Sequence, residues 1–161
     1  MNGEVWRYGR VMELRTEIEI AAPASRVWDT LVDFSRYSEW NPFIPEISGE
    51  LRVGAELRVV VAPPGGNELR FQPKLLVVEP GRELRWRGKL FVKGLFDGEH
   101  FMQLVELAPG RTRFVHGENF SGLLVKLLGR ALTQTARGFV FMNQALKRRV
   151  EETAGSDLKP L

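Results

Sequence analysis

LLVKLLGRALTQTARGFVFMNQALKRRVEE, from Leu123 to Glu152, is the longest periodic stretch of this 161-residue sequence. Apolar residues recur in it every three or four positions, which predicts one amphipathic helix. The apolar face consists of Leu124, Leu128, Ala131, Thr135, Phe139, Met142, Leu146 and Val150. The polar face consists of Lys126, Arg130, Arg137, Gln144 and Arg148. The helix would span about 45 Å, so we expect the shorter elements upstream to pack along it.

Upstream of this helix the pattern is typical of strands. From Glu13 to Ile20 charged and apolar residues alternate strictly, which predicts a half-buried strand. Two short helices are expected next, one from Pro23 to Asp33 and one from Ser35 to Trp40. After Ile47 the Gly and Pro turns divide the chain into about six further strands, including one from Leu69 to Glu79. Because the connections between these strands are short, we expect them to be antiparallel.

These elements predict an α+β protein with a helix-grip arrangement. In it, a curved antiparallel sheet of about seven strands surrounds the long C-terminal helix, and two short helices follow the first strand. We expect a single domain at residues 13–152, an N-terminal extension at residues 1–12 and a flexible tail at residues 153–161. A curved sheet around a helix leaves a volume between them, which is the natural place for a ligand.

Composition excludes several classes of function. The chain has no Cys, which removes disulfides, thiolate nucleophiles and cysteine zinc sites and favours a cytoplasmic location. No apolar run reaches the roughly 20 residues of a membrane span, so no stable membrane insertion is expected. The net charge is +3, and the only tight basic cluster, at residues 147–149, lies where cations stabilise the C-terminal end of a helix. We therefore expect no nucleic-acid partner.

Several runs resemble the polyketide cyclase/dehydrase branch of the START-related lipid-transfer superfamily. They are Ala22–Leu31, Asp33, Tyr37, Trp40–Phe43, Gly94–His100 and His116–Leu124. The resemblance covers roughly residues 13–152 and implies a helix-grip fold with a deep hydrophobic cavity. Members of this family bind lipids, sterols, polyketides or plant metabolites, and some catalyse cyclisation or dehydration.

His100, His116 and Glu118 are the polar residues that point to chemistry. Strand phase places all three on otherwise apolar faces, so we expect them to point inward. A hairpin turn at residues 109–110 would bring His100 opposite or diagonal to Glu118. One interpretation is a general acid/base group whose pKa values are shifted toward neutrality by burial. The other, which we favour, is a hydrogen-bonded polar cluster that joins two strands.

The sequence predicts no cofactor and no metal site, because the spacing of its two His residues matches no metal motif. It also lacks a nucleophile elbow, a P-loop and a dinucleotide fingerprint. Candidate cavity-lining residues are large apolar groups and one helix threonine. They are Trp28, Tyr37, Trp40, Phe43, Trp86, Phe91, Phe96, Met102, Phe114, Phe120, Leu128, Thr135, Phe139 and Met142. For Trp28, packing in the core is the favoured alternative.

The apolar loop at residues 89–96 predicts either a lid over the cavity or a contact in a homodimer. Three functions follow from these features. The first is a carrier or sensor that binds a small hydrophobic ligand of lipid, polyketide or aromatic type. The second is a cofactor-independent cyclase or dehydratase that uses the His/Glu cluster. The third is a protein-interaction module, which a filled cavity would favour.

Overall fold

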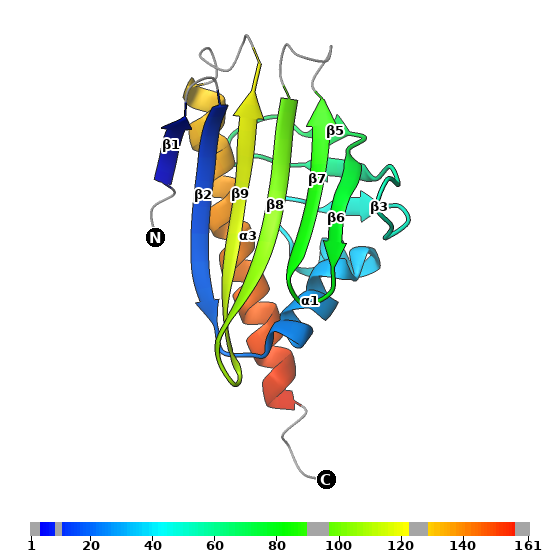
Figure 1. Cartoon of the computed structure of the whole chain (residues 1–161), viewed down its shortest axis with the longest axis vertical. Coiled ribbons are helices and arrows are strands. Elements are labelled where there is room, and N and C mark those ends of the chain that lie inside the picture. Colours follow the sequence, from blue (N-terminus) through cyan, green and yellow to red (C-terminus); the bar gives the residue numbers. More distant parts are fainter. Residues whose placement is uncertain (1–3, 9–10, 90–96, 123–128, 157–161) are drawn as a thin grey trace.

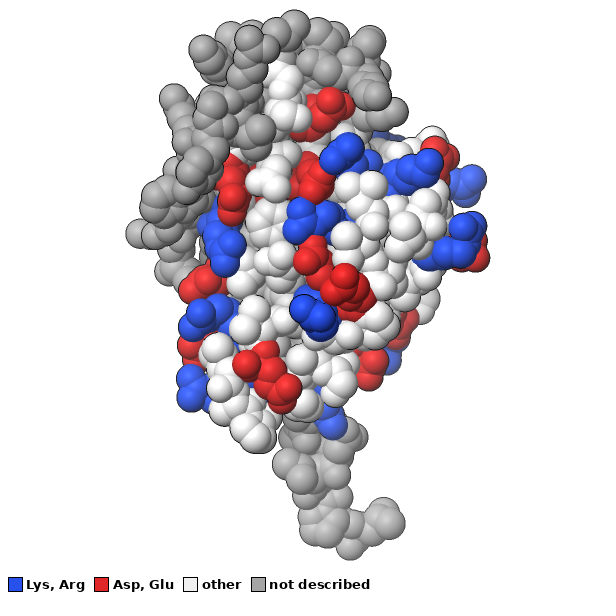
Figure 2. Space-filling view, in the orientation of Figure 1, with Lys and Arg blue, Asp and Glu red and all other residues white. Residues whose placement is uncertain are grey.

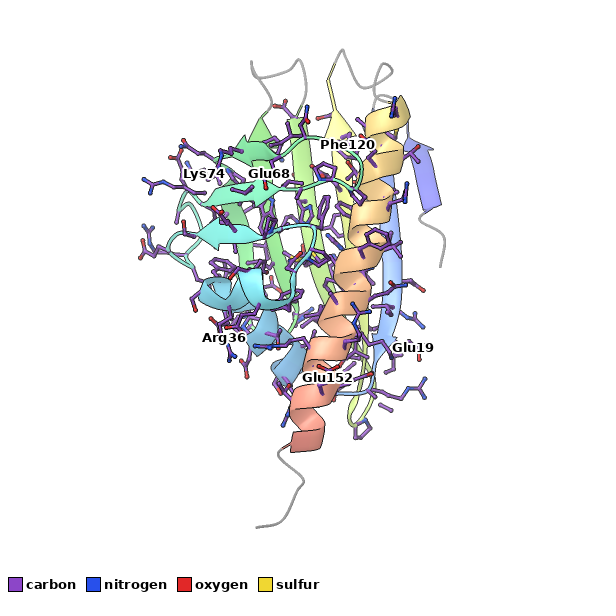
Figure 3. All side chains as sticks on the ribbon, turned by 180° about the vertical axis from the view of Figure 1, so that it is seen from behind. Glu19, Arg36, Glu68, Lys74, Phe120 and Glu152 are labelled. Atoms are coloured by element: carbon purple, nitrogen blue, oxygen red, sulfur yellow. The ribbon has the colours of Figure 1, made fainter. Side chains whose placement is uncertain are left out.

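The computed structural model describes residues 4–8, 11–89, 97–122 and 129–156 of the chain. These residues form two layers (Figures 1 and 3). One layer is a six-stranded antiparallel sheet, and the other contains a long helix, a three-stranded sheet and short helical segments. The long helix crosses one face of the larger sheet diagonally (Figure 1). The predicted α+β helix-grip fold is therefore confirmed.

The large sheet has the strand order β1-β2-β9-β8-β7-β6, and each neighbouring pair is antiparallel. Its strands are β1 (Glu4–Tyr8), β2 (Val11–Ile20), β6 (Lys74–Glu79), β7 (Glu83–Lys89), β8 (Asp97–Ala108) and β9 (Arg111–Ser121). Residues 4–8 are thus an edge strand paired with β2, whereas the sequence shows no periodicity there. Hydrophobic periodicity reports which face of a strand is buried, whereas β1 is identified by its backbone pairing with β2.

The small sheet has the order β3-β4-β5, with β3 at Glu46–Ser48, β4 at Arg58–Val61 and β5 at Leu69–Phe71. The single strand predicted from Leu69 to Glu79 is wrong, because the chain leaves the small sheet after β5 and enters the large sheet at β6. Pro73 lies at this break, since a proline cannot donate a ladder hydrogen bond. The described residues therefore contain nine strands in two sheets, where the sequence predicts about seven in one.

The two short helices expected after the first predicted strand are present. They are α1 (Ala24–Val32) and a segment made of the 3-10 turn η1 (Phe34–Arg36) and α2 (Tyr37–Trp40). The long helix α3 is described from Gly129 to Ser156 and packs mainly on β2. The predicted start of this helix, at residues 123–128, lies outside the described residues. None of the described helices is long and apolar enough to cross a membrane.

The predicted apolar face of α3 has two different surroundings along its length. In the C-terminal part, Phe139, Met142, Leu146 and Val150 are fully buried in the core. Toward the N-terminal end, Thr135 is half-buried and Ala131 is exposed. Figure 3 shows the small sheet beside this part of α3, with Phe120 of β9 close to the helix. The two layers are therefore tightly packed at one end and leave space at the other.

The opposite face of the large sheet is covered with charged side chains of both signs (Figure 2). Arg85 bonds to Glu83 and Glu99, and Glu99 also accepts from Arg87. Opposite charges on adjacent strands stabilise such an exposed face modestly.

Candidate binding cavity

A cavity of about 170 Å³ lies where the two layers separate. Apolar cavities of roughly 150 Å³ in proteins bind benzene, so this one has room for about one aromatic ring. Its lining residues come from the large sheet, from the small sheet, from α3 and from the segment that follows α2. They are Phe43, Ile44, Val59, Val61, Pro63, Leu69, Phe71, Pro73, Trp86, Gly88, Gly98, His100, Glu118, Phe120, Ala131 and Thr135.

One wall is built by the turn that follows α2. The side-chain oxygen of buried Asn41 accepts hydrogen bonds from the backbone N–H groups of Phe43, at 3.0 Å, and Ile44, at 2.8 Å. The Phe43 ring then packs on the backbone of α3 at Gly138, where a Cβ would lie 2.1 Å from the ring. Gly138 therefore permits this close approach, and any residue with a Cβ at this position would clash with the ring.

The small sheet forms a second wall through the alternation of its strands. Register pairs Val59 with Phe71 and Val61 with Leu69, and all four line the cavity. The next pair along, Val60 and Arg70, belongs to the opposite face of this sheet. The small sheet therefore contributes apolar side chains to the cavity, whereas its other face carries the buried Val60 and the exposed Arg70.

The polar end of the cavity is formed by β8 and β9. Register pairs His100 directly with Glu118, as the hairpin phase predicts, and both line the cavity. His100 Nδ1 lies 3.7 Å from Glu118 Oε2. The His100 ring stacks on Trp86 with a centroid distance of 4.7 Å. His116 lies behind His100, fully buried, with its ring stacked on Phe139 at 4.0 Å.

A hydrogen-bond chain continues from these histidines into the core. His116 Nε2 lies 3.0 Å from His100 Nε2, and His116 Nδ1 lies 2.8 Å from Asn143 Oδ1. Asn143 Nδ2 donates to Thr16 Oγ1 at 2.8 Å, and Thr16 Oγ1 donates to the backbone oxygen of His116 at 3.0 Å. Asn143 and Thr16 are both buried. The chain thus joins α3, β2, β9 and β8.

The partners fix where the protons lie. Because the Asn143 amide nitrogen donates to Thr16, its oxygen faces His116, and His116 Nδ1 must carry a proton. His116 is neutral, so its Nε2 is an acceptor and His100 Nε2 must be the donor. His100 Nδ1 then carries no proton and is an acceptor that faces Glu118. The Glu118 carboxyl group lies 3.7 Å away, beyond hydrogen-bond distance, so the continuous chain runs from His100 to Thr16 with every donor pointing the same way.

The pKa values agree with this neutral arrangement. Burial lowers the pKa of His100 to about 3 and, together with the neighbouring His100, lowers the pKa of His116 well below its usual value. Burial raises the pKa of Glu118 to about 8. The predicted shift toward neutrality therefore holds for the carboxyl group, whereas both histidines shift away from it. The cause is that their imidazolium forms would be desolvated without an adequate counter-charge.

The residues predicted to line the cavity or to carry chemistry separate into three groups. Phe43, Trp86, Phe120, Thr135, His100 and Glu118 line it. A second group is buried in the core or packs against it and is not among the described lining residues. It consists of Trp28, Tyr37, Trp40, Met102, Phe114, His116, Phe139 and Met142. Outside the described side chains are Phe91, Phe96 and Leu128, together with the predicted lid or dimer contact at residues 89–96.

Sequence reasoning missed Asn143, Thr16 and Gly98. Asn143 follows Phe139 by four positions on the buried face of α3, and a polar residue within an apolar stripe is a usable signal. Gly98 gives no such signal. A Cβ at this position would lie 2.2 Å from Glu118 Oε1, so the absence of a side chain makes room for the carboxyl group.

A six-stranded sheet, a long helix packed on one of its faces beside a smaller sheet, and a cavity between these layers define a helix-grip protein of the START-related superfamily. The chain belongs to the family described as polyketide cyclase/dehydrase and lipid transport, whose model matches residues 12–152. The resemblance noted from the sequence is thereby confirmed. No curated protein matches the sequence.

Solved structures with the same fold include enzymes and a protein named only by its superfamily. The Zhui aromatase/cyclase from Streptomyces sp. R1128 is 18% identical, with a TM-score of 0.72 over 89% of this chain and 96% of that one. Norcoclaurine synthase from Thalictrum flavum is 15% identical, with a TM-score of 0.71 over 89% and 96%. A START superfamily protein from Mycobacterium smegmatis is 22% identical, with a TM-score of 0.63 over 88% and 98%. At these identities the likeness shows the fold alone.

Proposed function

We propose that this protein binds a small hydrophobic molecule with one aromatic or alicyclic ring in the cavity, as a carrier or sensor. The observation that carries this proposal is the cavity itself, which is enclosed mainly by apolar side chains and has a carboxyl group at one end. Sites of this kind take the ligand by apolar burial and orient it through a few polar groups. Family membership supports the same class of ligand.

A titration with the neutral ring compound 4-ethylanisole tests this proposal. Thr135 lines the cavity from α3, so Thr135→Trp should fill the space and weaken binding at least tenfold. Thr133 lies on the same helix but is exposed, so Thr133→Trp is the matched control and should bind like the wild type. Calorimetry or NMR titration measures both. Equal binding by the two variants would place the site elsewhere, and no binding by the wild type would contradict the proposal.

A second candidate function is proton transfer to or from the bound molecule. It is supported by the position of Glu118, which lines the cavity, has a pKa of about 8 and faces the bare Nδ1 of His100. His116 lies behind the wall, so its part would be to orient His100. Glu118→Gln would leave a carrier intact but remove such catalysis. The third function, a protein-interaction module, is favoured by a filled cavity, and no observation here supports it.

A further inference from the structure

We propose that the cavity selects neutral ring compounds carrying a hydrogen-bond donor, a hydroxyl or N–H group, and rejects carboxylates of the same size. This inference rests on the proposed ligand-binding function and specifies the polar group of the ligand. It follows from the direction of the hydrogen-bond chain that begins at His100, whose free ring nitrogen faces Glu118.

The chain determines which atom of Glu118 is available to a ligand. His100 Nδ1 is an acceptor and Oε2 is the carboxyl oxygen that faces it, at 3.7 Å, so a proton on Oε2 is better placed than a proton on Oε1. Oε1 then remains as a carbonyl-type acceptor. It lies over Gly98, which also lines the cavity, and one fifth of the Glu118 side chain is exposed. A ligand that presents a donor to Oε1 satisfies it, whereas a ligand without a donor leaves it unpaired.

The walls determine what the rest of the ligand must be. Phe43, Phe71 and Phe120 line the space next to the carboxyl group, together with Trp86, whose ring stacks on His100. These side chains favour a flat apolar body. The cavity volume of about 170 Å³ matches a body of about one ring. The ligand is therefore small enough for its single polar group to be fixed at the Glu118 end.

The charge of the site argues against acids. Among the described lining residues the ionisable side chains are Glu118 and His100, and no Lys or Arg is present to pair with an anion. A carboxylate would thus be buried without a counter-charge, next to another carboxyl group and a histidine held neutral by burial. Burying an unpaired charge is far more costly than burying a neutral polar group.

Three matched probes at pH 6.5 test the inference: 4-ethylphenol, 4-ethylanisole and 4-ethylbenzoate. They share one ring and one alkyl group and differ only in the polar substituent. We expect the phenol to bind roughly five- to tenfold more tightly than the methyl ether, the effect of one hydrogen bond. We expect the benzoate to bind at least tenfold more weakly than the ether. Calorimetric titration of the full chain measures all three.

Two variants connect this selectivity to Glu118. Glu118→Gln should keep the phenol preference, because the amide can donate to His100 Nδ1 and present its oxygen to the ligand. Glu118→Leu should reduce the phenol-to-ether ratio to about one while both still bind. Equal wild-type affinities for phenol and ether, tight binding of benzoate, or an unchanged ratio in Glu118→Leu would overturn the inference and leave ligand binding standing. Failure of all three probes to bind would contradict the proposed function as well.

Discussion

Replacing Phe139 by alanine is expected to lower the free energy of unfolding by about 3–5 kcal/mol. Phe139 is fully buried on α3, and its ring stacks on His116 at 4.0 Å. It also makes T-shaped contacts with the rings of His100, at a centroid distance of 5.2 Å, and Phe43, at 5.4 Å. Its removal would leave a void between the polar chain and the wall of the cavity. Chemical denaturation, followed by circular dichroism, measures the change.

Phe141 provides the matched control, because it lies on the same helix with 42% of its surface exposed. Phe141→Ala should change stability by less than about 1 kcal/mol. If Phe139→Ala does not fold, Phe139→Leu, which keeps much of the buried volume, should cost about 1–2 kcal/mol. A similar loss for Phe139→Ala and Phe141→Ala would show that the Phe139 ring is not packed as described.

The second large effect concerns the pH dependence of stability. The pKa of Glu118 is about 8 in the folded protein and about 4.5 when the carboxyl group is unperturbed. Between these values the folded state holds a proton that the unfolded state has released, so stability falls as pH rises through this window. The buried histidines act in the opposite direction, because their lowered pKa values cost stability as pH falls below about 6.5.

The window from pH 6.5 to 8 therefore isolates Glu118. We expect the wild type to lose about 1.5 kcal/mol of stability across it relative to Glu118→Gln, because the folded-state carboxyl group goes from almost fully to half protonated over these 1.5 pH units while the unfolded one stays ionised. Gln keeps the donor to His100 but does not titrate. Denaturation of both proteins at several pH values measures the difference. Parallel stability curves would mean that the Glu118 carboxyl group is ionised at neutral pH and not held as a proton donor.

Local pattern was enough to predict the fold class and part of the site. Strict alternation from Glu13 to Ile20 predicts β2, the strand on which α3 packs. The helical period predicts the C-terminal part of α3. Strand phase and a short turn also place His100 opposite Glu118, because the register of a hairpin is set by local geometry. These features depend on neighbouring residues in the chain, which a single sequence displays.

The features that were missed depend on contacts between distant segments. Pro73 could equally have marked a bulge in one long strand, and only the pairing of β6 with β7 shows that the chain changes sheet there. Likewise, Asn143 bonds to His116 and Thr16, which are 27 and 127 residues away along the chain. Periodicity says that a side chain points inward. It does not say whether it meets a cavity, as Trp86 does, or the core, as Trp28 does.

An isotope-filtered NOE experiment tests the central claim most directly. With labelled protein and unlabelled 4-ethylanisole, we expect contacts from the ligand ring to Val61, Phe120 and the Thr135 methyl group, which line the cavity from three different elements. The exterior groove on the other side of the small sheet, lined by Val60 and Arg70, should show none. Contacts confined to that groove, or their absence at Phe120 and Thr135 with ligand bound, would contradict a binding site between α3 and the two sheets.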